Sequence, residues 1–321
     1  MIPTISAVLL SASMFTVHTD TTAAVKPGTR LVIENFGGNV AVSTWTRNAV
    51  RIEAEHSTHS EIDIESAESA LRIVTSGRRG VPGSVDMHIT MPKWMDLKVS
   101  GVYTGVSVEG SEGEVRASTV RGDLSVNGGR GFVVLESVQG DVVARNTRAR
   151  LKLSSVNQGV EVSNAQGEVH AESVNGDVML SGIISSMVDA SSVNGGICYR
   201  GSIARDGHYH FSTHNGDVDL GLPDDASATV SVSTFSGDFD SAFPAKLFDS
   251  GGRRFNMTLG AGDAEIMLET FQGTVHLRHA SEPCSGRRER HEMRIKQKDK
   301  ERMEKDQRNE DRDTTDEGES Q

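Results

Sequence analysis

The chain has 321 residues, and its 33 Lys and Arg against 45 Asp and Glu give a formal net charge of −12. That acidity argues against nucleic acid as a partner, because phosphate backbones are bound by positive surfaces. Hydrophobic residues make up 36% of the chain and allow a packed core, whereas the 5% aromatic content argues against a large aromatic-lined ligand pocket. The many Val, Ser, Gly and Asp residues predict short strands and turns.

Residues 1–24 are expected to form a signal peptide. The apolar run from Ile5 to Val17 has the length of a signal-peptide core and is too short to span a bilayer as a helix. Thr22 and Ala24 are small enough for a cleavage site, although no Lys or Arg precedes the run, and a buried first strand is the alternative. No later stretch has the ~18 apolar residues of a membrane span. We therefore expect an exported chain without a transmembrane span, located in the periplasm, on the cell surface or in the medium.

Residues 25–112 are expected to form an N-terminal β cap and the first strands. The segment 31–57 predicts paired strands around the turn at Gly37-Gly38-Asn39, and the segment 85–101 predicts further strands. A cap is needed because an uncovered terminal coil would expose open strand edges and part of the core.

Residues 113–279 contain a repeat of the form [S/E]-[S/T]-V-x-G-D-V. Its central hydroxyl residue recurs at Thr119, Ser137, Ser155, Ser173, Ser192, Thr213, Thr234 and Thr270. The successive steps are 18, 18, 18, 19, 21, 21 and 36 residues, and the last step fits two periods with one degenerate copy. Each period holds two strands and two corners, with no helical pattern between the strands.

This period predicts an all-β, single-domain β-solenoid, similar to a parallel β-helix, with coils of about 18–21 residues stacked in sequence order. Alternating residues such as Val174, Val178 and Leu180 are expected to point inward and to stack between coils. Eight to ten coils spaced ~4.8 Å apart would form a rod ~40–50 Å long with flat sides. The corner glycines, for example Gly176 and Gly216, are expected to adopt positive φ.

Residues 280–321 are expected to be a disordered, charged tail. From Arg287 to Gln321 there are eleven Lys or Arg and twelve Asp or Glu, with only Met293, Ile295 and Met303 as apolar residues. No apolar stripe is available to pack this segment against a domain.

The segments ENFGGNVAVSTWTRNAVRIEA and ITMPKWMDLKVSG, followed by serial S-V-x-G-D-V units, resemble the bacterial putative-adhesin family of β-strand-repeat proteins. The resemblance covers roughly residues 25–279. It implies a β-solenoid-like fold and an exported or envelope-associated protein, and it carries no catalytic residue set.

Two groups of residues are candidate metal ligands. Asp177 and Asp217 belong to a column of corner aspartates in which carboxylates from neighbouring coils could converge on Ca²⁺. The calcium-binding pattern G-G-x-G-x-D is absent, so each aspartate more simply satisfies turn backbone and faces water. His208, His210 and His214 could bind zinc or copper, but their spacing matches no established ligand pattern.

We expect no catalytic residues and no cofactor, because the chain has no GxSxG, HExxH, Walker A or GxGxxG pattern in a suitable context. Cys198 and Cys284 have no metal-ligand spacing and cannot form a disulfide framework, so we expect neither crosslinks nor zinc to hold the fold together, and Cys198 to be a small core residue. The favoured function is a non-catalytic, adhesin-like module that binds an envelope, glycan or protein surface. The alternatives are a structural envelope protein that self-associates end to end and a β-helix carbohydrate-active enzyme.

Overall fold

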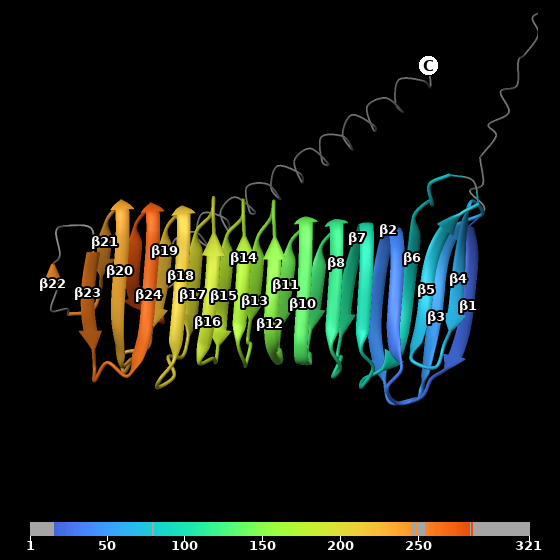
Figure 1. Cartoon of the computed structure of the whole chain (residues 1–321), viewed down its shortest axis with the longest axis horizontal. Coiled ribbons are helices and arrows are strands. Elements are labelled where there is room, and N and C mark those ends of the chain that lie inside the picture. Colours follow the sequence, from blue (N-terminus) through green and yellow to red (C-terminus); the bar gives the residue numbers. More distant parts are fainter. Residues whose placement is uncertain (1–15, 79, 245–247, 250–253, 283, 285–321) are drawn as a thin grey trace, which may run out of the picture.

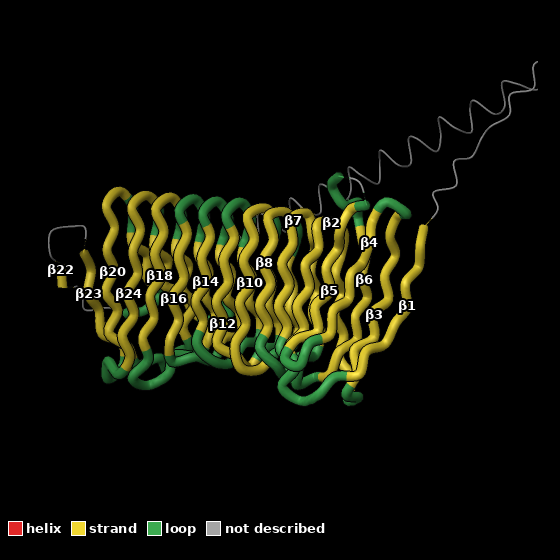
Figure 2. The backbone as a smooth tube through the Cα atoms, turned by 45° about the vertical axis from the view of Figure 1, so that its right-hand side comes forward, coloured by secondary structure: helices red, strands yellow, loops and turns green. Residues whose placement is uncertain are grey.

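The computed structural model describes residues 16–78, 80–244, 248–249, 254–282 and 284. In this part of the chain all regular secondary structure is β-strand, and the strands stack into a straight rod (Figure 1). The rod has two flat faces that are joined by tight corners on both sides (Figure 2). The predicted all-β solenoid is therefore confirmed.

Each coil contributes one strand to each face, and two long strands run across a corner to serve both faces. Face A contains, in spatial order, β4 (Ser60–Ser66), β5 (Ala70–Gly77), the first half of β2 (Arg30–Trp45), the first half of β7 (Leu97–Glu109), β8 (Val115–Arg121), β10 (Arg130–Gln139), β12 (Arg148–Ser155), β14 (Val169–Ser173), β16 (Met187–Ser192), β18 (His208–Asn215), β24 (Ala264–Gln272), β20 (Ala228–Ser236), β23 (Arg254–Leu259) and β22 (Phe248–Asp249).

Face B is assembled in the same way. It contains β1 (Thr16–Ala24), β3 (Ala49–Ser57), β6 (Val85–Pro92), the second halves of β2 and β7, β9 (Leu124–Asn127), β11 (Val142–Arg145), β13 (Val160–Ser163), β15 (Val178–Ile183), β17 (Ile197–Gly201), β19 (Val218–Leu222), β25 (Val275–His279) and β21 (Phe239–Ser241). From β2 to β20 the strands of neighbouring coils are parallel, as the repeat predicts.

The core lies between the two faces and is built from the alternating residues of each strand. Val178 and Leu180 of β15 are 0% and 1% exposed. Val178 pairs in register with Val160 on β13, and Leu180 pairs with Val162. Because side chains alternate across a strand, every second residue points inward, and apolar residues at these positions fill the space between the faces in every coil. Tyr199, Tyr209 and Phe211 are also buried here.

The repeated Ser or Thr is buried at the end of each face A strand. The hydroxyl of Ser173 donates to the carbonyl of Gln158 in the preceding coil at 2.9 Å, and that of Ser192 donates to the carbonyl of Gly176 at the same distance. The same bond joins Ser137 to Gly122, Ser155 to Gly140, Thr213 to Gly195 and Thr270 to Gly216. A buried corner carbonyl needs a donor, which explains why the repeat keeps a hydroxyl at this position.

The prediction of positive φ at the corner glycines is wrong for Gly176 and Gly216, neither of which has a left-handed backbone. The need for glycine is instead the close contact between coils. A Cβ atom on Gly176 would lie 2.2 Å from the carbonyl oxygen of Gln158, and one on Gly216 would lie 2.2 Å from that of Gly195. Neighbouring backbones are too close at these positions to admit a side chain.

Val174 was predicted to point inward, but it is 39% exposed and points outward. It follows the buried Ser173, and alternation along the strand continues through this position, so the side chain after the hydroxyl must face solvent. The equivalent valines of the other coils, Val120, Val138, Val156 and Val193, are likewise exposed.

The last coils do not follow the order of the chain. Strand β24 lies between β18 and β20 and pairs with both in parallel, so the coil of Thr270 separates the coils of Thr213 and Thr234. The 36-residue step is therefore not two periods with one degenerate copy. It contains β21, β22 and β23, through which the chain reaches the end of the rod before it turns back to insert a coil.

Antiparallel strands close both ends of face A. At the N-terminal end β4 pairs with β5, and at the C-terminal end β23 pairs with β20, so face A ends in an antiparallel pair on both sides. The end strand β4 carries the exposed acids Glu61, Asp63 and Glu65. Charges on an edge strand discourage pairing with another molecule.

Residues 16–24, which fall within the predicted signal peptide, form the edge strand β1 and pair antiparallel with β3. Cleavage after Ala24 would remove this strand and make β3 the edge of face B. The apolar run before Thr16 and the tail beyond Cys284 lie outside the described residues. Among the described residues there is no helix long and apolar enough to cross a membrane.

Candidate functional surfaces

The outward side chains form straight rows because neighbouring coils are stacked in register. One row on face A consists of Ser100, Ser118, Glu136, Ser154, Glu172, Ser191, Ser212, Glu269 and Ser233. These groups repeat at the ~4.8 Å distance between strands and present hydroxyls and carboxylates to solvent. This row gives face A a regular polar stripe along the rod.

Two imidazoles and three carboxylates form a network on the outside of face A. Asp189 accepts contacts from the Nδ1 atoms of His170 and His210, each at 3.1 Å, and so joins three neighbouring strands. The Nε2 atom of His170 lies 2.7 Å from Glu172, and that of His210 lies 3.5 Å from Glu269. Sequence analysis did not single out His170 or Asp189, because their proximity depends on the register between β14, β16 and β18.

The three histidines singled out in the sequence are not brought together. His208 contacts Glu265 at 3.3 Å, while His210 belongs to the network around Asp189. His214 lies at the corner, where its ring stacks on Phe271 with a centroid distance of 4.6 Å. No group of three or more His, Cys, Asp or Glu side chains is placed to hold a metal ion in the part of the chain that the structure describes.

The corner aspartates hold the backbone of the next coil. Oδ1 of Asp177 accepts the N–H of Gly196 at 2.6 Å, and Oδ1 of Asp217 accepts the N–H of Thr274 at 2.7 Å. Asp123 and Asp141 make the same contact with the coil that follows each of them. These bonds correspond to the simpler interpretation of the Asp column, in which the carboxylates satisfy turn backbone.

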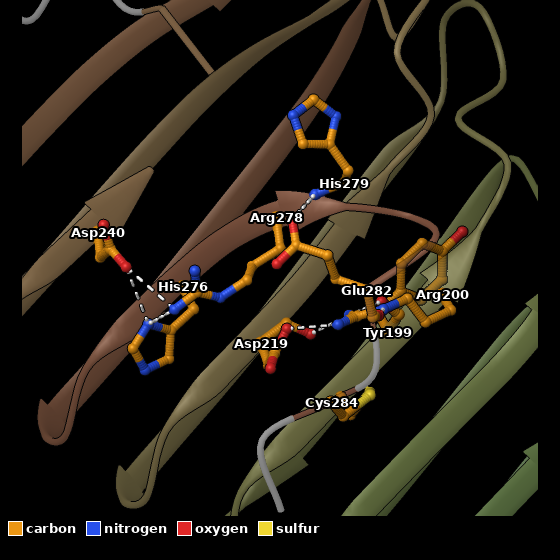
Figure 3. Close-up of polar contacts among 10 residues, drawn as sticks. Tyr199, Arg200, Asp219, Asp240, His276, Arg278, His279, Glu282 and Cys284 are labelled. Carbon is orange, nitrogen blue, oxygen red and sulfur yellow. Dashed lines mark hydrogen bonds and ion pairs between the residues drawn. A yellow bond between two sulfur atoms is a disulfide. The ribbon is translucent and has the colours of Figure 1, made fainter. Parts of the chain in front are cut away.

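A C-terminal strap, residues 280–282 and 284, lies against β17 and β19 on the outside of face B (Figure 3). Cys284 forms a disulfide with Cys198, and both residues are buried although Cys198 points outward from β17. Cys198 is buried as expected, but it lies on the outer side of face B and is crosslinked, which the sequence analysis did not anticipate. Two cysteines 86 residues apart have no local sequence signal for pairing, and only the strap brings them together. The strap consists of residues that the sequence analysis assigned to the start of the tail.

Beneath the strap lies a buried ion pair between Arg200 and Asp219. The guanidinium Nη2 donates to Oδ1 of Asp219 at 2.7 Å, and the two side chains are 13% and 5% exposed. Nε of Arg200 donates to the backbone carbonyl of Glu282 at 2.8 Å, so the same guanidinium fixes the strap (Figure 3). Hydrogen bonds to the remaining donors are what make a buried ion pair tolerable.

Two tyrosines in the core have perturbed ionisation. Burial raises the pKa of Tyr199, with a smaller contribution from Tyr209, and burial also raises the pKa of Tyr209 itself. The hydroxyl of Tyr199 donates to the carbonyl of Ser202 at 2.9 Å, and that of Tyr209 donates to Ser185. Both phenols therefore remain neutral and support the corner turns around residues 185 and 202.

A coiled, two-faced stack of mostly parallel strands defines this chain as a β-solenoid. The chain belongs to the Toastrack DUF4097 family, whose model matches residues 29–278. The family confirms the resemblance found in the sequence.

Several solved structures are similar to this chain at low sequence identity. A "putative adhesin" from Bacteroides fragilis is 10% identical, with 81% of this chain and 97% of that chain covered and a TM-score of 0.44. A "putative adhesin" from Parabacteroides distasonis has the same identity and coverage and a TM-score of 0.43. A "putative cell adhesion protein" from Clostridium sporogenes is 12% identical over 82% and 100% of the two chains, with a TM-score of 0.22. No curated protein matches this sequence.

Proposed function

We propose that this protein is an exported, non-catalytic, adhesin-like module that uses the flat faces of its rod to bind an extracellular or envelope surface. The observation that carries the proposal is the set of straight outward rows, such as Ser118, Glu136 and Ser154 on face A. Rows of hydroxyls and carboxylates on a rigid scaffold can make many weak contacts at once, and such contacts add up by multivalency.

Export is supported by the disulfide between Cys198 and Cys284. Disulfides persist in the periplasm, on cell surfaces and outside cells, and are rare in the reducing cytoplasm. The test is to isolate the native protein after alkylating free thiols and to analyse its peptides by mass spectrometry. A linked Cys198–Cys284 peptide in an extracytoplasmic fraction is expected, whereas alkylated cysteines in a cytoplasmic fraction would contradict export.

Binding is tested with the oxidised full chain on arrays of purified polysaccharides and on intact cells. Two matched variants add positive charge to one face each: Ser118→Arg with Ser154→Arg on face A, and Ser107→Arg with Ser125→Arg on face B. All four side chains point outward, so the core is preserved. We expect one pair to reduce binding and the other to leave it unchanged. Equal binding by both pairs and the parent chain would contradict recognition through a flat face.

The enzyme alternative is separated by the same polysaccharide panel. Release of new reducing ends or unsaturated products over time would identify turnover and contradict a non-catalytic role. Binding without product release is the expected result.

A further inference from the structure

An apolar ridge runs along the corner that follows face A. In the ten coils from β2 to β20 the outward position at this corner is apolar or aromatic. In eight of them it follows the repeated buried hydroxyl, and in β2 and β7 it follows Asn35 and Gly101. The apolar ridge consists, in spatial order, of Phe36, Val102, Val120, Val138, Val156, Val174, Val193, His214, Phe271 and Phe235.

The ridge remains exposed although it is apolar. The five consecutive valines from Val120 to Val193 are between 38% and 49% exposed, and Phe271 is 39% exposed. These positions contribute nothing to the core between the faces, which the alternate residues fill completely. A polar residue would satisfy the strand equally well, so the fold alone does not require valine here.

The ridge itself contains no Asp, Glu, Lys or Arg side chain. The residue after Val120 is Arg121, but in four neighbouring coils the next residue is asparagine and forms a polar ladder. In this ladder Nδ2 of Asn175 donates to Asn157 at 3.1 Å, Asn194 to Asn175 at 2.9 Å and Asn215 to Asn194 at 2.8 Å. These side chains are neutral, in a chain whose net charge is −12. Two copies of an acidic rod repel each other over most of their surfaces, and an uncharged strip lets them approach.

The spacing of the ridge restricts its partner. Backbone bonds such as Asn175 N–H to the carbonyl of Val156, 2.9 Å, keep the valines at the ~4.8 Å strand spacing. An extended peptide repeats every ~6.7 Å along one face and a helix every ~5.4 Å, so neither stays in step with ten such side chains. A second strand ladder has the same spacing and can interdigitate along the whole length.

We propose that the apolar ridge is a docking surface for a second copy of this chain, with two rods lying side by side and their ridges interdigitated. The ridge exposes on the order of 600 Å² of side-chain surface per copy, which places a pair near the ~1,200 Å² lower limit of specific interfaces, and the asparagine ladder adds to this area. A contact of this size forms a weak, concentration-dependent pair. The proposal does not depend on export or on binding to a surface.

The test measures the mass of the oxidised full chain by sedimentation over roughly 1 µM to 1 mM, the range expected for a small interface. The variant carries Val138→Thr, Val156→Thr and Val174→Thr, which keep β-branched side chains. The control carries the same change at the outward Val32, Val74 and Val143, away from the ridge. We expect the parent chain to form a pair. The dissociation constant of this pair should rise roughly tenfold or more in the ridge variant and should be unchanged in the control.

A second measurement uses Val174→Cys, near the centre of the ridge, with Ser125→Cys on face B as its control. Mild oxidation is expected to join two chains through Cys at position 174 and to leave the control as single chains. Any of three results would overturn the proposal. The parent chain could stay monomeric at every concentration, the ridge variant could associate as strongly as the parent, or the mass could grow without limit because the rods join through their ends. Circular dichroism establishes that the variants fold.

Discussion

Replacing Gly176 by Ala tests whether close contact between coils is what requires glycine at the corners. The added Cβ would lie 2.2 Å from the carbonyl oxygen of Gln158 and 2.7 Å from the backbone nitrogen of Gly159. Both contacts are with backbone, which cannot rotate away as a side chain can, so the coils must separate locally. Overpacking of this kind costs about 1–3 kcal/mol, and the shift also strains the hydrogen bond from Ser192 to the carbonyl of Gly176.

The neighbouring coil provides a matched control. A Cβ on Gly159 would meet the carbonyl oxygen of Asp177 at 3.1 Å and nothing closer, so Gly159→Ala should cost less than about 1 kcal/mol. Thermal unfolding is followed by circular dichroism and by the fluorescence of Trp45 and Trp94 near the N-terminal end, because coils in a repeat protein can unfold separately. A loss of 2 kcal/mol lowers the midpoint by about 4–8 °C for a domain of this size. Equal losses in the two variants would refute the role assigned to coil spacing.

Three further changes probe the interior. Thr213→Val removes the hydroxyl that donates to the corner carbonyl of Gly195 and should cost about 1–3 kcal/mol of stability. Thr234→Val, in the end coil, removes a buried hydroxyl with no partner among the described residues and should be neutral or stabilising. Denaturant unfolding of both variants checks this, and a larger loss for Thr234→Val would contradict it. Arg200→Met takes the guanidinium from the buried carboxylate of Asp219 and should cost about 3–5 kcal/mol in the same assay, and a loss below 1 kcal/mol would mean that water reaches the pair. Because burial raises the pKa of Tyr199 in the folded chain, the contribution of Tyr199 to stability should be constant below pH ~10 and should be lost as the pH rises above it. Phenolate absorbance that develops fully before unfolding would contradict this.

Much of the fold could be predicted from the repeat. The spacing of the hydroxyl residues located the coils from Thr119 to Thr213, and the alternation around Val178 and Leu180 identified the core. These features are local, because strand alternation and corner composition are set by neighbouring residues. The predicted inward orientation of Val174 was wrong because the alternation was started at the wrong residue, and the buried hydroxyl of Ser173 occupies the inward position.

The candidate surfaces were less accessible to sequence reasoning. His210 was singled out, but its partners Asp189 and His170 lie 21 and 40 positions earlier in the chain, so finding them requires the register of three strands. Likewise, the separation of Cys198 and Cys284 along the chain did not indicate that they would form a disulfide.

Taken alone, the order of amino acids established that coils exist, how long each one is and which of their residues can fill a core, because these follow from alternation and turn chemistry within some twenty neighbours. It could not establish which coil lies next to which. The insertion of β24 between β18 and β20, the closure of the strap over Arg200 and the alignment of ten outward side chains into one ridge all depend on contacts between distant segments. Identical strand edges can pair in many orders, and only the packing of the whole rod selects one.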